Sequence, residues 1–343
     1  MTQRLPLMLA ALLMAATTAS AETGDTDAFT CEAAPAPVVR LDHGSRYAAE
    51  DDSRSEFDEA SNDEVNKQLK PVDDFINDLA VAANTAVSSP DERSLASDCV
   101  LAGLQSWAEA GALSELATMN AQLSVPSRVA GLAFAYAQVR PFLSASDDTE
   151  QVEGWLAERA RATMAYFDTD APKNASRNNL RAWAGLAVAR VGLTLDDPAM
   201  IDWADASVRL VACQAAPDGS LPLEMARRDL ALHYQLHAVT PLVVTAALLR
   251  DAKPDLFDAC DGAIHRTVDF VVAAFDDPGL VERIAGHEQS YFDGSEKLRA
   301  FELAWAEAYL SLFDDEDLRA FVEGYGDLGN SKLGGKQSVL WGI

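Results

Sequence analysis

The sequence has few basic side chains for its length. Among 343 residues, 27 are Lys or Arg and 54 are Asp or Glu, which gives a formal net charge of −27. Such a charge repels the phosphates of nucleic acids and the anionic surfaces of membranes, so general binding to either is disfavoured. An anionic ligand requires a local positive cleft. The hydrophobic content of 49% is nevertheless enough for a globular protein, and one large domain fits this length.

Familiar catalytic and metal-binding motifs are also absent. The chain contains no G-x-S-x-G, no phosphate-binding glycine-rich loop, no H-E-x-x-H, no C-x-x-C and no Ca²⁺-binding loop. The acidic run Asp314 to Asp317 lacks the spacing of such a loop and is typical of a helix end or a solvated face. We therefore expect neither a metal nor a cofactor.

Cysteine is scarce, and the four cysteines are too few for a small protein held together by disulfides. They are Cys31, Cys99, Cys213 and Cys260. In an exported protein they can oxidise, and the sequence alone permits three pairings.

Long apolar runs are rare, and the first one is typical of an export signal. Residues 1–21 carry one basic side chain, Arg4, then an apolar run from Leu5 to Ala16, and end in the small-x-small pattern Ala19-Ser20-Ala21. This run is shorter than the roughly 20 residues that a membrane-spanning helix needs. We expect residues 1–21 to be a signal peptide and the mature protein to be periplasmic or secreted.

No later segment is expected to span a membrane. The apolar stretch 242–249 is preceded by Pro241 and stopped by Arg250. We expect a monomer that binds neither a membrane nor nucleic acid.

The remaining chain divides into an arm and a helical body. Residues 22–64 are acidic and polar, and we expect an extended N-terminal arm or lid. In residues 65–343 apolar side chains recur at helical spacing, and breakers such as Val125-Pro126 and Asp197-Pro198 separate segments of roughly 15 to 35 residues. The pattern predicts an all-α fold of helical hairpins, either an α/α toroid or an open solenoid. The absence of a clear fixed-period repeat disfavours the solenoid.

Charge is unevenly distributed over this body. Residues 173–250 hold eight basic and seven acidic side chains, a net charge of +1, while the rest of the chain carries nearly all the negative charge. We expect a cleft for an anionic substrate, if present, to lie in this region.

Two short segments contain the best candidates for chemistry. In the first, Asn178 and Asn179 open a helix that includes Trp183, although an asparagine at that position is often only a helix cap. In the second, Arg227 and Tyr234 are seven residues apart, so two turns of one helix would place them on nearly one face, with His237 one turn further. A cation beside a phenol favours the phenolate.

These segments belong to a wider resemblance. The chain resembles the alginate lyases of polysaccharide lyase family 5, which are periplasmic α/α-toroid enzymes that cleave polymannuronate. The similar segments run in order from residue 29 to residue 335: 29–33, 45–47, 98–99, 107–113, the Asn-Asn and Arg-Arg blocks, 304–309 and 332–335.

The resemblance implies roles for individual residues. Tyr234 matches the catalytic tyrosine of the family, Arg227 its active-site arginine, and Asn179 the pair beside its catalytic histidine, with Trp183 closing that motif. We assign substrate binding to the remaining polar residues of these segments, namely Asn178, Arg228, Arg46, His233 and His237, together with Trp183. Arg46 stands where the family has a lid lysine, so charge is kept but shape is not.

The family's histidine is missing. Leu180 stands in its place, and Ala182 replaces the family's tyrosine. We expect His233 or His237 to compensate from the neighbouring helix. The resemblance also pairs Cys31 with Cys99, which leaves Cys213 and Cys260 to pair by elimination.

The resemblance implies cleavage of a 1,4-linked polyuronate, mannuronate-rich alginate, by metal-independent syn β-elimination. Tyr234 would act as base and acid, and Asn179 and Arg227 would neutralise the C6 carboxylate. Three alternatives stay open at this point. They are a glucuronan lyase with the same mechanism, an inactive relative that binds anionic polysaccharide, and a hydrolase with two carboxylates about 5 to 9.5 Å apart.

Overall fold

The computed structural model describes residues 29–145, 147–277, 279–290 and 298–342. The signal peptide predicted for residues 1–21 lies outside these residues.

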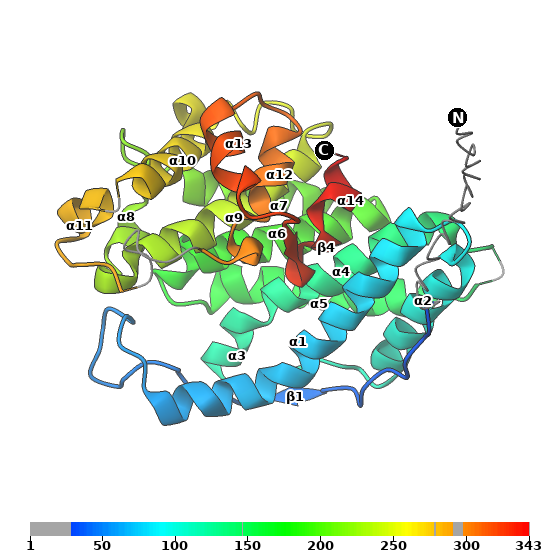
Figure 1. Ribbon diagram of the computed structural model, residues 1–343. Coiled ribbons are helices and arrows are strands. Elements are labelled where there is room, and N and C mark those ends of the chain that lie inside the picture. The colour runs from blue at the N-terminus through cyan, green and yellow to red at the C-terminus, as the bar shows by residue number, and fades with distance from the viewer. Residues whose placement is uncertain (1–28, 146, 278, 291–297, 343) are drawn as a thin grey trace, which may run out of the picture.

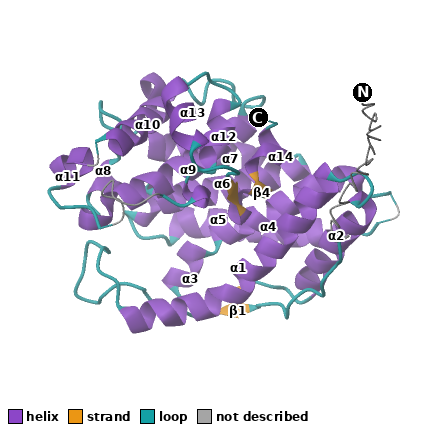
Figure 2. Ribbon diagram, viewed as in Figure 1, coloured by secondary structure: helices purple, strands orange, loops and turns teal. Residues whose placement is uncertain are grey.

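Helices dominate the described chain, as Figures 1 and 2 show. The α-helices are α1 (Glu59–Ser88), α2 (Arg93–Glu109), α3 (Met119–Ser124), α4 (Pro126–Val139), α5 (Glu150–Thr169), α6 (Asn179–Leu195), α7 (Pro198–Ala212), α8 (Pro222–Met225), α9 (Ala231–Leu249), α10 (Ala259–Asp276), α11 (Gly279–Ala285), α12 (Trp305–Leu310), α13 (Glu316–Glu323) and α14 (Gln337–Trp341). Short 3-10 turns are η1 (Arg140–Phe142), η2 (Ala175–Arg177), η3 (Arg228–Leu230), η4 (Ala300–Glu302) and η5 (Ser331–Leu333).

The described strands are two residues long and form two small pairs. β1 (Arg40–Leu41) pairs in parallel with β2 (Glu115–Leu116), and β3 (Gly329–Asn330) pairs antiparallel with β4 (Gly335–Lys336). The predicted all-α fold class is confirmed. The molecule is an α/α toroid, an incomplete barrel in which α6 packs against α4, α5, α7 and α9.

The predicted breakers mark real helix boundaries. α4 begins at Pro126 and α7 at Pro198, where a proline loses no helical hydrogen bond because its first-turn N–H would have no partner. The Asp197 side chain caps α7 by accepting from the backbone N–H groups of Ala199 and Met200, at 3.0 and 3.2 Å. Local chemistry therefore sets where these helices start.

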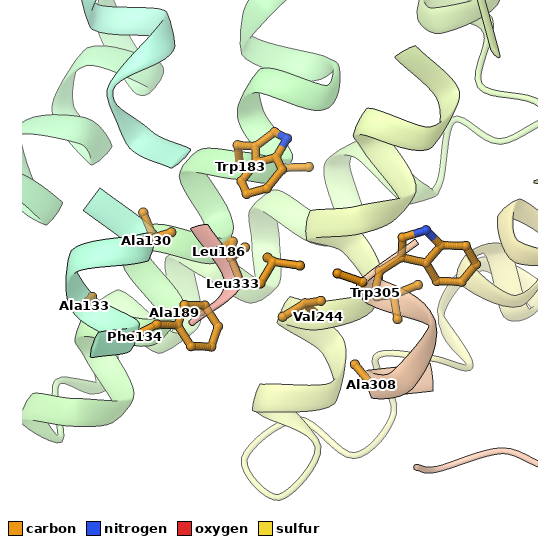
Figure 3. Close-up of a cluster of buried hydrophobic side chains, with 14 of the residues drawn as sticks. Ala130, Ala133, Phe134, Trp183, Leu186, Ala189, Val244, Trp305, Ala308 and Leu333 are labelled. Atoms are coloured by element: carbon orange, nitrogen blue, oxygen red, sulfur yellow. The ribbon is translucent and has the colours of Figure 1, made fainter. Parts of the chain in front are cut away.

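The core lies where the inner helices meet. Figure 3 shows Phe134 of α4, Trp183 and Leu186 of α6, Val244 of α9 and Trp305 of α12 within this buried cluster. Leu186, Val244 and Trp305 are fully buried. Packing of this kind holds the N-terminal ends of α6 and α9, which carry the candidate site residues, in fixed positions.

Within the part of the chain that the structure describes, one helix is apolar and long enough to cross a membrane by length and composition. It runs over Arg228–Leu249, so it includes η3 and α9, and 83% of its apolar window is buried inside the protein. Burial of this extent is typical of the core helix of a globular protein.

The N-terminal arm is fastened to the helical body at several points. The predicted disulfide Cys31–Cys99 is confirmed, and the Trp107 indole donates to the Pro35 carbonyl at 3.2 Å. In Figure 1 the arm, in dark blue, runs along the lower edge past β1 and forms a loop before α1. α1 begins at Glu59, six residues before the expected start of the body at residue 65, with the Asp58 carboxylate as its cap.

The second disulfide is confirmed as well. Cys213 at the end of α7 is bonded to Cys260 in the first turn of α10. Cys260, Asp261 and Gly262 have left-handed backbone dihedrals, so the regular part of α10 starts after them.

Candidate active site

A cavity of about 560 Å³ opens where the arm meets the helical body. Its lining comes mainly from residues 43–57 of the arm, residues 119–128, residues 172–183 at the start of α6, residues 223–237, and Lys332 of η5. Its volume lies in the range of small-molecule and cofactor pockets. Segments almost 300 residues apart in sequence thus meet around one space.

Charged side chains that line this cavity are mostly cationic. Among the described lining residues one is acidic, Asp52, and the basic ones are Arg46, Arg54, Arg128, Arg227 and Lys332. In a protein with a net charge of −27, this local excess of positive charge attracts an anionic ligand. Residues 173–250, where we expected a cleft for an anionic substrate, supply much of this lining and Arg227, whereas the other four cations come from other segments.

Tyr234 and Arg227 are in direct contact at the cavity wall. The guanidinium carbon of Arg227 lies 3.4 Å from the centroid of the Tyr234 ring. The predicted geometry, two turns of one helix, is wrong. Arg227 lies between α8 and η3, Tyr234 lies in the first turn of α9, and Arg228 between them has a positive φ of 53°. This turn folds Arg227 back over the ring.

A second phenol completes this group. The Tyr47 hydroxyl of the arm is hydrogen-bonded to the Tyr234 hydroxyl, and the Arg227 guanidinium carbon lies 5.4 Å from the Tyr47 ring centroid. Burial raises the pKa of Tyr47, and the Arg227 charge opposes that shift. Tyr47 belongs to one of the segments that resemble the family, but sequence reasoning gave it no role.

The arm loop is shaped by a buried carboxylate. Asp51 accepts hydrogen bonds from the backbone N–H groups of Ser53, Ser55 and Glu56, at 2.9, 2.5 and 2.8 Å. Burial alone would raise the pKa of Asp51, but the hydrogen bonds lower it, so the charged form is held. The loop presents the carbonyl oxygen of Arg54, which accepts a hydrogen bond from Arg227.

Asn178 and Asn179 open α6 as predicted. The Asn178 side chain caps the helix by accepting from the Leu180 N–H at 3.0 Å. Asn179 is 0% exposed, and both its backbone N–H and its Nδ2 donate to Glu224, at 2.8 and 2.9 Å. Its Oδ1 atom is buried without a hydrogen-bond partner. Asn179 is thus held from one side at the cavity wall.

Glu224, which accepts both hydrogen bonds from Asn179, is buried. Burial raises the pKa of Glu224 to about 7, although the hydrogen bonds from Asn179 and the charge of Arg227 lower it. Glu224 is one of many acidic residues in the sequence, and no sequence pattern singled it out. It accepts from Asn179 and does not line the cavity.

The residues around the missing histidine form a neutral wall. Leu180 lines the cavity with Trp183, His233 and His237, and the two imidazole rings are parallel with centroids 6.0 Å apart. Burial lowers the pKa of His233 to about 4 and that of His237 well below its ordinary value, so both are neutral near pH 7. The Trp183 indole donates to the His237 carbonyl at 3.0 Å.

Two predicted substrate-binding arginines lie in different environments. Arg46 lines the cavity, and its Nη1 donates to the Asn62 side chain at 3.1 Å. Arg228 is exposed and is not part of the lining. Its positive φ turns the chain between Arg227 and α9.

Sequence reasoning missed the cations that other segments supply. Arg128 of α4 is 6% exposed, and its Nη2 lies 2.6 Å from the Asp73 carboxylate of α1, which also lies 3.5 Å from the Lys332 ammonium. An arginine directly before the apolar run 129–135 is a usable signal, because a buried charge needs a partner. Among the described residues, no group of three His, Cys, Asp or Glu side chains is placed to hold a metal ion.

Comparisons with known proteins fit this geometry. The alginate lyase family profile matches residues 12–280 of this chain. A polysaccharide lyase from Stenotrophomonas maltophilia (strain K279a) is 30% identical over 294 residues, which cover 84% of this chain and 85% of that protein. The chain belongs to the alginate lyase family. It is accordingly a polysaccharide lyase, and this class replaces the hydrolase reading.

Other members of the alginate lyase family agree. An alginate lyase from Pseudomonas syringae pv. syringae (strain B728a) is 27% identical over 85% of this chain and 77% of its own length. The crystal structure of alginate lyase A1-III from Sphingomonas species A1 matches with a TM-score of 0.72 and 23% identity over 91% of this chain and 86% of that one. A tyrosine-to-phenylalanine variant of A1-III, complexed with a tetrasaccharide, matches with a TM-score of 0.75 and 23% identity over 90% and 85%. These structures establish the shared fold.

Proposed function

We propose that this lyase cleaves a 1,4-linked polyuronate, mannuronate-rich alginate, by metal-independent syn β-elimination with Tyr234 as base and acid. The observation that carries the proposal is the contact of Arg227 with the Tyr234 ring at the wall of a cavity whose charged lining is mostly cationic. The alginate lyases among its relatives support this substrate class.

β-Elimination makes three demands on the site. The C6 carboxylate must be neutralised so that the C5 proton becomes more acidic, a base must take that proton, and an acid must protonate the departing O4. In mannuronate the C5 hydrogen and O4 lie on the same side of the ring, so one group can serve the second and third steps.

We assign these two steps to Tyr234. The positive charge of Arg227 against its ring favours the phenolate, and the Tyr47 hydroxyl can donate a hydrogen bond to that phenolate. The phenolate then takes the C5 proton and returns it to O4 as the C4–O4 bond breaks and the C4=C5 bond forms. No oxidant or further reactant is needed.

Asn179 and Arg227 are assigned to the substrate carboxylate. An amide nitrogen carries two hydrogens, and Glu224 accepts one from Asn179 Nδ2, which leaves the other for the ligand. Such donors stabilise the charge that develops on the carboxylate as C5 loses its proton. Trp183 is assigned to the pocket wall beside the sugar.

We assign to His233 and His237 the polar contact with the substrate that Leu180 cannot make. Both imidazoles line the cavity and are neutral near pH 7, so either can hydrogen-bond to the sugar without adding a charge. Asn178, as the helix cap, holds the start of α6 against the substrate.

Glucuronan is the second candidate substrate. Leu180 lines the cavity where the family has histidine, so the lining differs from the family pattern at this position. Glucuronate shares the C4 and C5 configuration of mannuronate and differs at C2, so the same mechanism serves it. Guluronate is inverted at C5 and would need a base on the opposite face.

The cellular location is also part of the proposal. The signal pattern in residues 1–21 and the two disulfides support a periplasmic or secreted enzyme, because disulfides persist in oxidising compartments. We expect it to act as a monomer.

The deciding experiment is an ultraviolet absorbance assay on the mature protein with polymannuronate, polyguluronate and glucuronan in separate reactions. Elimination leaves an absorbing C4=C5 bond, so we expect absorbance to rise with polymannuronate and to respond least to polyguluronate. A rise only with glucuronan selects the second candidate, and binding without a rise identifies an inactive relative. Loss of activity with a chelator contradicts the metal-independent mechanism.

A further inference from the structure

A second cavity of about 450 Å³ adjoins the first. The two share Trp183, His233, His237 and Lys332 in their linings, so they meet at these side chains. The catalytic candidates Tyr234, Arg227 and Asn179 line only the first cavity. The second extends past Thr240 of α9 toward η4, β3 and η5.

The lining of the second cavity suits a sugar. It combines the side chains of Asn77, Asn330, Ser331 and Thr240, which offer amide and hydroxyl groups, with the ring of Phe301. Phe301 is 44% exposed, which leaves ring surface for contact with the apolar face of a sugar.

The charges of this cavity also suit a uronate. Each of its two acids is paired, Asp73 with Arg128 and Lys332, and Glu302 with Arg299 at 2.9 Å. The described lining itself holds these two acids and one base, Lys332; with Arg128 and Arg299, which lie outside the lining, the group of two acids and three bases carries a net charge of +1. Burial and the charge of Arg128 lower the pKa of Lys332 to about 8, so it remains largely protonated at pH 7.

The outer end repeats the pairing of an aromatic ring with an arginine. The Arg299 guanidinium carbon lies 4.7 Å from the Phe301 ring centroid, and the Asn330 side chain donates to the Phe301 carbonyl at 3.1 Å. The ring is thus held at the cavity edge with a positive charge beside it.

We propose that the second cavity binds the uronate units that follow the two units between which the polymer is cleaved. Lys332 would bind a carboxylate where the two cavities meet, and Phe301 would stack on a sugar at the outer end of the second cavity. This inference rests on the proposed polyuronate substrate. Its consequence is that Phe301 is a specificity-determining residue for chain length and does not contact the shortest oligomers.

The test is calorimetric binding of oligomannuronates and oligoglucuronates of increasing length to Tyr234→Phe protein, which is expected to bind without turnover. We expect affinity to increase with length and then level off. Adding Phe301→Ala should weaken binding of the long oligomers about tenfold and leave that of the shortest unchanged. Phe301→Trp, which keeps an aromatic face, should retain the affinity.

The chain offers a matched control. Phe142 is 38% exposed and has the Arg93 guanidinium carbon 4.5 Å from its ring centroid, and it lines neither cavity. Phe142→Ala in the same background should bind every length as the parent does. If Phe301→Ala and Phe142→Ala bind every length alike, the inference is overturned.

The failure of this inference can be told apart from failure of the proposed function. If the unmodified enzyme cleaves polymannuronate or glucuronan but Phe301→Ala has no length-dependent effect, only the inference fails. If no uronate polymer is cleaved but the length-dependent loss appears, the second cavity still binds uronates and the proposed catalysis fails.

Discussion

The Arg227 guanidinium covers the Tyr234 ring at 3.4 Å, although Arg227 lies in the turn before η3 and Tyr234 lies in α9. Between the two residues, Arg228 has a left-handed backbone, which turns the chain between Arg227 and α9. Arg227 also donates to the carbonyl of Arg54, so the same side chain joins the arm to the phenol ring of Tyr234. The position of the arm and the environment of Tyr234 are therefore coupled.

Tyr234→Phe should lower activity at least a hundredfold, because it removes the group assigned as base and acid. The fold and polymer binding should persist, and circular dichroism and calorimetry check both. Tyr309→Phe is the matched control, since it removes a hydroxyl that is hydrogen-bonded to His265 at 2.7 Å, away from the cavity. Substantial activity in Tyr234→Phe would identify another residue as the base.

Leu180→His should raise activity on polymannuronate, because it restores a polar partner for the carboxylate or the base at the cavity wall. Leu180→Met, which keeps an apolar side chain, should not. Initial rates on polymannuronate and glucuronan provide the measurement. No gain on either polymer would argue that the pocket has been rebuilt around leucine.

Glu224→Gln should change how stability depends on pH. The pKa of Glu224 rises from 4.5 to about 7 on folding, so its stabilising contribution is complete below pH 4.5 and is lost as pH rises through 7. The free energy of unfolding of the parent, minus that of Glu224→Gln, should therefore fall between about pH 4.5 and 8, by up to about 3 kcal/mol.

Denaturant unfolding at several pH values provides the measurement for Glu224. Glu109→Gln, at an exposed position, controls for the loss of one carboxylate from the protein. A free-energy difference that stays constant with pH would show that Glu224 does not titrate on folding as described.

Gly219→Ala should destabilise the protein by more than about 1 kcal/mol. Gly219 has a φ of +90°, and a Cβ there would lie 1.9 Å from the Arg266 carbonyl oxygen. Gly154→Ala in the interior of α5 meets nothing within 4 Å and should stabilise slightly, since alanine favours helix. Thermal unfolding of both variants tests the contrast, and equal melting temperatures would refute it.

Much of the local structure could be predicted from the sequence. The breakers at Pro126 and Pro198 and the cap at Asn178 act within one helical turn, so their chemistry is visible in neighbouring residues. The resemblance to the family placed the Cys31–Cys99 disulfide correctly. The sequence could not predict the turn at Arg228, because a positive φ at an arginine leaves no periodic pattern in the sequence.

The amino-acid sequence by itself determined the helical hairpins, the order of the elements and the segments that carry Tyr234, Arg227 and Asn179. Only the tertiary structure decided that Tyr47, Arg128 and Lys332 join them around one cavity. The physical reason is the distance along the sequence over which each interaction acts. Periodicity and capping act between residues a few positions apart, whereas a cavity forms where packing brings together side chains from distant segments, and no local pattern encodes that meeting.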